Sequence, residues 1–240
     1  MTADEDAPIF DPAAFRLTVQ EAELTTLARR LGQNKLAARA ATFDREARFP
    51  TENYHDLRDA GLLGICVPRE HGGFGADYRA YALTAAEIGR YCGATALTWN
   101  MHVCSCLWSG PLADGMDMSN AERAEHERRR VQHYARIIGA GAIYAQPFSE
   151  GGTAAAGAVP FATTARRDGD GWRLSGRKIF ASLSGSADYY GILCTEAQGD
   201  AALSRRNTLY VAVPATAAGL TVTGDWDPLG MRGTVSRTLI

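Results

Sequence analysis

Glycine is unevenly distributed along the chain, and this restricts the folds the chain can adopt. Ten glycines fall within residues 1–138, and fifteen fall within the shorter stretch 139–240. Because glycine destabilises helices, the first part suits helices and the second suits turns. A length of 240 residues is enough for two domains. We therefore predict an α+β protein with an amino-terminal α-helical domain at 1–137 and a β domain at 138–240.

Hydrophobic periodicity supports the same division. Leucines recur at roughly helical spacing over residues 16–43, Thr51 can cap a following helix, and a helical pattern occupies residues 77–107. Ser119 precedes a charged helix that runs to about Ile137. From there the period changes to two, with a hairpin turn at residues 168–171 and further strands at 189–195, 208–213 and 220–223. Short turns without helical crossovers predict an antiparallel β domain.

Charge and hydropathy exclude several classes of partner. A net charge of −2 gives no electrostatic footprint for nucleic acid or for an anionic membrane surface. No apolar run approaches the roughly 18 residues of a membrane span. The acidic segment 1–11 has neither a basic region nor an apolar core, so we expect neither a secretory signal nor a transit peptide.

The five cysteines are an odd number and are widely scattered, which argues against a disulfide framework. Their pattern favours a reducing compartment, and we expect a cytoplasmic protein. Neither the cysteines nor the five histidines show metal-ligand spacing, so we predict no metal site.

Short motifs occur in an order that resembles the acyl-CoA dehydrogenase family. The first half carries Phe49-Pro50, the segment 57–68, Gly72-Gly73-Phe74-Gly75 and the segment 85–90. The second half carries Phe148-Ser149-Glu150-Gly151-Gly152, the segment 172–182 and Leu229-Gly230-Met231-Arg232-Gly233-Thr234. Each motif is weak alone, but together they cover most of residues 15–240 in the expected order.

The resemblance implies a helical domain, an antiparallel β-barrel-like middle domain and a carboxy-terminal helical bundle. This chain supplies the first domain, most of the second, which is incomplete at its end, and none of the bundle. The family's FAD-dependent reaction oxidises an acyl-CoA thioester between its α and β carbons, a step of lipid metabolism. The resemblance places five residues beside the flavin: Gln146, Phe148, Ser149, Phe180 and Ser182. The two serines would hydrogen-bond the polar rim of the ring and Phe180 would pack on it, whereas Glu150 would be structural.

Two departures from the family pattern follow the signature glutamate, and the first is Gly151 in place of the family's proline. The stretch Thr153-Ala154-Ala155-Ala156 lacks the usual Gly-Ser-Asp, whose serine helps to bind acyl-CoA. This weakens the expectation of a coenzyme A thioester but leaves the flavin in place. The family's catalytic glutamate belongs to the bundle, so the catalytic base is unknown here and expected beyond Ile240. We expect this chain alone to be inactive, and we expect its retention of FAD to be weak or absent.

Three functions therefore stay open. The first is an acyl-CoA dehydrogenase that passes electrons to an acceptor protein. The second is a flavin-dependent monooxygenase of the same fold, supplied by a flavin reductase. The third is a non-catalytic subunit or a truncated fragment. In each case the resemblance implies a homo- or hetero-oligomer.

Overall fold

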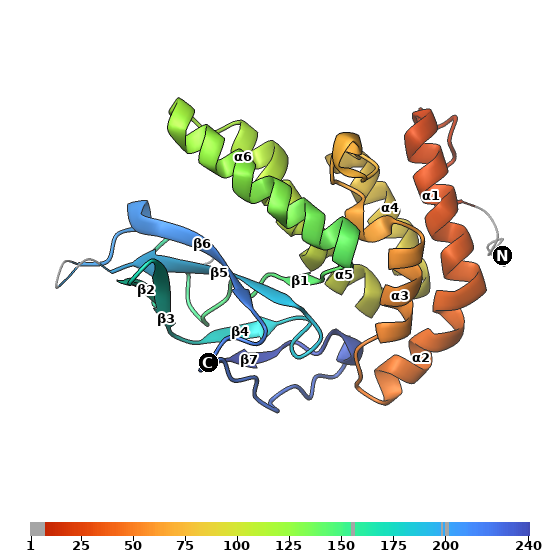
Figure 1. Ribbon diagram of the computed structural model, residues 1–240. Coiled ribbons are helices and arrows are strands. Elements are labelled where there is room, and N and C mark those ends of the chain that lie inside the picture. The colour runs from red at the N-terminus through yellow and green to blue at the C-terminus, as the bar shows by residue number, and fades with distance from the viewer. Residues whose placement is uncertain (1–7, 155–156, 198, 200–201) are drawn as a thin grey trace.

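In the computed structural model, helices fill one side of the molecule and strands fill the other (Figure 1). The structure describes residues 8–154, 157–197, 199 and 202–240. The α-helices are α1 (Val19–Leu31), α2 (Ala37–Arg45), α3 (Thr51–Asp59), α4 (Tyr78–Tyr91), α5 (Gly93–Leu107) and α6 (Asn120–Ala135). The strands are β1 (Tyr144–Ala145), β2 (Thr164–Asp168), β3 (Gly171–Ser175), β4 (Lys178–Ala181), β5 (Tyr189–Glu196), β6 (Thr208–Pro214) and β7 (Arg237–Leu239). The mixed α+β class predicted from the sequence is confirmed.

Local capping chemistry explains where the helices begin. Ser119 precedes α6 and accepts a hydrogen bond from the Glu122 amide, while the Glu122 carboxylate accepts one from the Ser119 amide at 2.8 Å. This reciprocal pair satisfies two backbone donors that a helix start leaves free. At α3 the prediction is wrong by one position. Pro50 is the capping residue there, and Thr51 is the first residue of the helix.

Helix α5 links the two sides of the molecule. Its Trp99 is fully buried and donates a hydrogen bond from Nε1 to the Leu62 carbonyl at 3.0 Å. Its His102 is also fully buried, and its Nδ1 accepts a hydrogen bond from the Tyr144 amide at 3.1 Å. Buried residues of the helices and of the sheet form one continuous apolar cluster. The domain boundary at residues 137/138 therefore stays a prediction.

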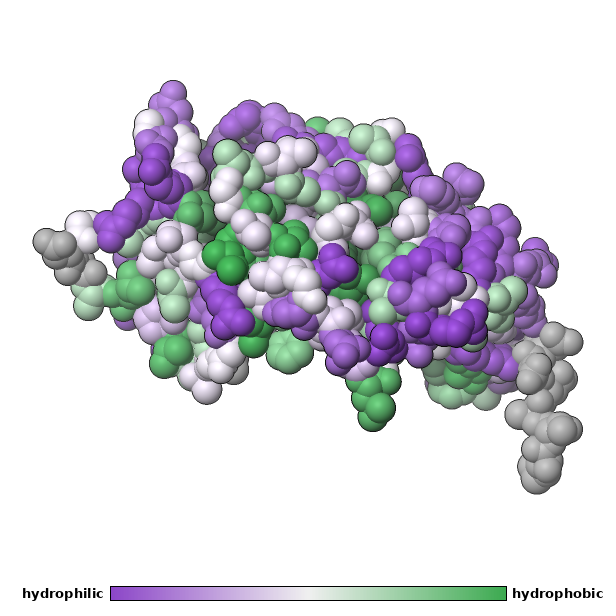
Figure 2. Space-filling view, turned by 90° about the horizontal axis from the view of Figure 1, so that it is seen from below, coloured by the Kyte–Doolittle hydropathy of each residue, from purple (hydrophilic) through white to green (hydrophobic). Residues whose placement is uncertain are grey.

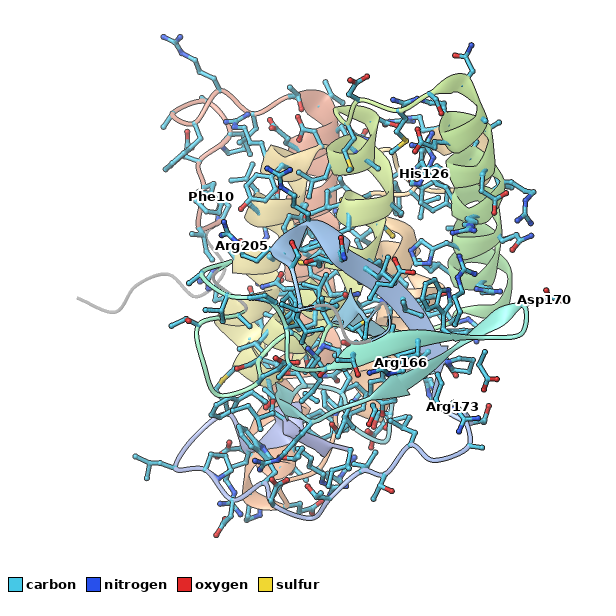
Figure 3. All side chains as sticks on the ribbon, turned by 90° about the vertical axis from the view of Figure 1, so that its left-hand side faces the viewer. Phe10, His126, Arg166, Asp170, Arg173 and Arg205 are labelled. Carbon is cyan, nitrogen blue, oxygen red and sulfur yellow. The ribbon has the colours of Figure 1, made fainter. Side chains whose placement is uncertain are left out.

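The main sheet has five strands with β5 at its centre. Strand β6 pairs with β5 antiparallel along one edge, and β3 pairs with β2 antiparallel through the predicted hairpin. Strands β1 and β2 both pair with β5 in parallel, at its two ends. Figure 3 shows cross-strand neighbours Arg166 and Arg173 side by side on the hairpin, with Asp170 at its tip.

Two expectations about the β domain are corrected. The sheet is mixed rather than antiparallel, because β5 runs parallel to β1 and β2. Between β3 and β5 the chain leaves the sheet and forms β4 in a second, two-stranded ribbon. The described strands form this open sheet and the two-stranded ribbon β4–β7, so a closed barrel is not confirmed. The strand expected at residues 220–223 is reduced to a single bridge at Val222, which faces Leu239 of β7.

Candidate functional site

The candidate site is formed by two neighbouring segments, residues 146–150 and strand β4. The first segment follows β1 directly, and its Ser149 carbonyl accepts a hydrogen bond from the Ile179 amide at 2.8 Å. The hydrogen bond from Tyr144 to His102 fixes β1 against α5, and so fixes the start of this segment. All five residues predicted to contact a flavin thus lie on two adjacent stretches of backbone or directly after them.

Gln146 and Phe148 face the junction between the sheet and the end of α5. The Gln146 side-chain oxygen accepts a hydrogen bond from the Tyr210 hydroxyl at 2.9 Å. Its amide nitrogen is buried and has no hydrogen-bond partner among the described residues. The ring of Phe148 lies 5.1 Å from that of Trp108, which in turn stacks on Tyr210. The structure therefore groups these two side chains with an aromatic cluster that the sequence did not indicate.

Phe180 has the geometry of a functional residue. Its side chain is 65% exposed and its φ is +52°, in the left-handed region that aromatic residues seldom adopt. The β4–β7 register shifts between Lys178 and Ala181, and such irregularities redirect side chains out of a strand. One edge of the ring meets Trp226 at a centroid distance of 6.3 Å. The strained backbone presents a large apolar ring on the surface, a feature typical of binding sites.

Ser149 and Ser182 differ in their surroundings. Ser149 is half-buried, and its backbone lies next to Ile179. Ser182 is buried just after β4, and its hydroxyl lies 2.8 Å from the Ser236 hydroxyl. In the described part of the chain, no hydrogen bond joins the two predicted serines to each other.

Glu150 is held by an ion pair inside the β domain. Its Oε1 lies 2.8 Å from Lys178 Nζ, and the two side chains are only 8% and 3% exposed. The carboxylate also accepts hydrogen bonds from the amides of Ala162 and Thr163, at 2.7 and 2.8 Å, and from the Thr163 hydroxyl. Burial alone would raise the pKa of Glu150, but the hydrogen bonds from Lys178 and Thr163 outweigh it and the pKa is lowered. Such a carboxylate stays charged and positions the neighbouring Ser149.

Lys178 completes this anchor. Its Nζ donates to the Leu193 carbonyl at 2.6 Å and lies 4.4 Å from the centre of the Phe161 ring. Burial lowers the pKa of Lys178, and the nearby Glu150 carboxylate opposes that shift. The pair therefore joins the two segments of the candidate site at a single buried point.

Sequence reasoning missed Ser236 and Thr234. The hydroxyls of Ser182, Ser236 and Thr234 form a continuous row with 2.8 Å between successive oxygens. The signal in the sequence is weak: Thr234 is the last residue of a motif already noted, and a second small hydroxyl residue, Ser236, follows two positions later.

These residues suit a planar group with a polar rim. Phe180 offers an exposed ring face, and the Gln146 amide leaves a buried donor without a partner among the described residues. Ser149 and Ser182 carry hydroxyls on the same two segments or directly after them. Seen from the side of the β4–β7 ribbon, apolar atoms gather across the middle of the face and polar atoms cover the helical end (Figure 2). A flavin, whose ring is apolar and whose pyrimidine edge is polar, meets these requirements.

A hollow of about 670 Å³ in the β domain adjoins the candidate site through Lys178, which lines it. The β2–β3 hairpin, β6 and the end of β7 enclose it, and none of the five predicted contact residues lines it. Among the described residues, no cluster of three or more His, Cys, Asp or Glu side chains could hold a metal ion. Over the same residues, no helix is both long enough and apolar enough to traverse a bilayer.

Comparison with known proteins identifies the family. Residues 18–114 match the acyl-CoA dehydrogenase N-terminal domain, and residues 148–240 match the acyl-CoA dehydrogenase middle domain. The chain belongs to the acyl-CoA dehydrogenase family. The bovine (Bos taurus) mitochondrial short-chain specific acyl-CoA dehydrogenase is 32% identical over 213 residues, which are 88% of this chain and 48% of that protein.

Solved structures share the fold of this acyl-CoA dehydrogenase family chain. KijD3, solved with FMN and a dTDP-linked amino-keto sugar, is 25% identical with a TM-score of 0.73, covering all of this chain and 53% of its own. The dibenzothiophene monooxygenase TdsC from Paenibacillus sp. A11-2 is 20% identical with a TM-score of 0.70, covering 90% of this chain and 50% of its own. The chain spans about half the length of the relatives it matches.

Proposed function

We propose that the protein is an FAD-dependent oxidoreductase of the acyl-CoA dehydrogenase type, acting on the α and β carbons of an acyl-CoA thioester. The observation that carries this proposal is the strip formed by Ser149, Phe180 and Ser182. It combines an exposed aromatic ring on strained backbone with a half-buried serine and a buried serine, carried by or directly after two hydrogen-bonded segments. The FMN of the KijD3 structure supports a flavin as the cofactor, and membership of the acyl-CoA dehydrogenase family favours FAD among the flavins.

Each residue has a separate task in this proposal. Phe180 packs on one face of the ring and excludes water from it. Ser149 and Ser182 hydrogen-bond the polar rim and so orient the ring towards the substrate. Gln146 and Phe148 complete the wall on the side of α5. The flavin, when bound, accepts the hydride removed from the substrate.

The catalytic base is not assigned to any residue of this chain. Glu150 is unsuitable because its carboxylate is already paired with Lys178 and with the donors of residues 162 and 163. We place the base in sequence beyond Ile240, and we expect the 240-residue chain alone to be inactive. An electron-acceptor protein and assembly into an oligomer belong to the same proposal.

A second candidate is a flavin-dependent monooxygenase on the same fold. The stretch Thr153–Ala156 lacks the serine with which the family pattern helps to bind acyl-CoA. Within this stretch, Ala154 is buried in an apolar cluster with Phe161 and Leu193. Ala155 and Ala156 of the same stretch lie outside the described residues. The similarity in fold to a dibenzothiophene monooxygenase supports this alternative.

Two measurements test the proposal. Titration with FAD should give saturable binding that weakens in Ser149→Ala and Ser182→Ala but not in Ser175→Ala, an exposed serine on β3 used as control. Both measurements use protein that extends past Ile240 into the helical bundle, because we expect the 240-residue chain alone to be inactive. Anaerobic bleaching of its bound FAD by a panel of acyl-CoAs would then favour the dehydrogenase. Oxygen-dependent turnover with a flavin reductase, without bleaching by any acyl-CoA, would favour the monooxygenase instead.

A further inference from the structure

Three buried hydroxyls lead from the candidate site towards the helical side of the molecule. Ser182 follows β4, Ser236 precedes β7, and Thr234 ends the short 3₁₀ turn η8 (Arg232–Thr234). Successive oxygens are 2.8 Å apart, and all three residues are buried. Water therefore competes little for these hydrogen bonds, and the three hydroxyls must find their hydrogen-bond partners within the protein.

The far end of the row fixes the direction of every hydrogen bond in it. Thr234 donates its hydroxyl hydrogen to the Met231 carbonyl at 2.9 Å, since a carbonyl can only accept. Each hydroxyl has one hydrogen, so Thr234 must accept from Ser236. Ser236 must in turn accept from Ser182. The hydrogen of Ser182 is thereby used inside the protein, and its oxygen is left with lone pairs only.

The surrounding backbone holds this arrangement in place. Met231 and Val235, on either side of η8, have φ values of +58° and +47°, which are strained for side chains of this kind. Between them, Gly233 packs so closely on the helices that an added Cβ would lie 3.3 Å from the Cβ of Ala94 on α5. The Met231 carbonyl therefore has little freedom to turn away from Thr234.

We propose that Ser236 and Thr234 are positioning residues that make Ser182 a hydrogen-bond acceptor towards the flavin. This inference rests on the proposed function. An oxidised flavin carries no hydrogen at N5, whereas a reduced flavin carries one there. Where a bound ring brings N5 to Ser182, an acceptor there would contribute a hydrogen bond to the reduced ring and none to N5 of the oxidised ring. The row of hydroxyls favours the reduced cofactor, and it reverses the donor role that the sequence suggested for Ser182.

The test compares affinities for FAD in two redox states. Dissociation constants are measured anaerobically for oxidised FAD and for dithionite-reduced FAD, with wild-type protein and Ser236→Ala. In the variant, Ser182 can turn its hydrogen outward and donate to oxidised N5. The variant can then hydrogen-bond the oxidised ring instead of the reduced ring. The preference for reduced FAD over oxidised FAD should therefore fall about threefold to tenfold. A tenfold change corresponds to about 30 mV in the two-electron midpoint potential.

Two further variants separate this role from a structural one. Ser236→Thr keeps a hydroxyl and should restore the wild-type ratio. Ser105→Ala removes a similarly buried hydroxyl on α5, remote from the strip, and should leave the ratio unchanged. If Ser236→Ala does not fold, Thr234→Val takes its place, since without Thr234 the Ser236 hydrogen can turn to Ser182.

Three outcomes would overturn the inference. An unchanged ratio in a folded Ser236→Ala that still binds FAD would remove the positioning role while leaving the proposed function intact. If the affinities for oxidised and for reduced FAD changed equally, Ser182 would be bonded to a flavin hydrogen that is present in both redox states, and the row would not favour the reduced cofactor. Absence of saturable FAD binding, in either state, by wild-type protein that includes the helical bundle would overturn the proposed function together with this inference.

Discussion

Replacing Lys178 by methionine should destabilise the protein through the carboxylate it leaves behind. Lys178 and Glu150 form an ion pair at 2.8 Å with both side chains almost fully buried. Breaking a buried pair by removing one partner typically costs about 3–5 kcal/mol. Glu150 keeps its hydrogen bonds from Ala162 and Thr163, so we expect a loss near the lower end, about 3 kcal/mol. The Leu193 carbonyl, which loses its donor at 2.6 Å, adds to this loss.

Urea denaturation followed by tryptophan fluorescence at pH 7 measures this loss. The double variant Lys178→Met/Glu150→Gln removes the unpaired charge, so it should recover part of the stability and give a double-mutant cycle with clear coupling. Arg173→Met is the matched control, because its ion pair with Asp168 is exposed, at 76% and 56%, and should be worth at most about 1 kcal/mol. A loss below about 1 kcal/mol for Lys178→Met, similar to that of the control, would refute the reasoning.

Two further predictions concern pH and backbone packing. Burial lowers the pKa of His102 to about 4 and that of His133 to about 3, so the folded state binds fewer protons than an unfolded chain with a histidine pKa near 6.5. Stability should thus be full above about pH 6.5 and fall as pH drops towards 4. The urea midpoint should fall between pH 7 and pH 5, and a flat profile would contradict the burial of both rings. Gly73→Ala should destabilise strongly, because its Cβ would lie 2.0 and 2.5 Å from two backbone carbonyl oxygens, whereas Gly139→Ala meets no atom within 4 Å. Equal melting temperatures for these two variants would contradict the close packing of Gly73 against the two carbonyl oxygens.

The sequence predicted elements whose causes are local. The turn residues at 168–171 predict the β2–β3 hairpin, and the structure pairs Asp168 with Gly171. Ser119, with Glu122 three residues later, determines where α6 begins. The helical pattern predicted over residues 77–107 corresponds to α4 and α5, which are separated only at Cys92.

Features that depend on distant partners could not be predicted in this way. The parallel pairing of β1 and β2 with β5 joins segments that periodicity alone does not connect. The five contact residues came from family resemblance, and their roles at a flavin stay predictions. Neither the exposure of Phe180, caused by an irregular β4–β7 pairing, nor the link from Ser182 to Ser236 across 54 positions has a local signature.

The most direct test of the account is a crystal structure of the protein grown with FAD. We expect the isoalloxazine ring packed on Phe180, with its polar rim within hydrogen-bond distance of the Ser149 and Ser182 hydroxyls. A ring bound elsewhere, for instance in the hollow between the β2–β3 hairpin and β6, would contradict it.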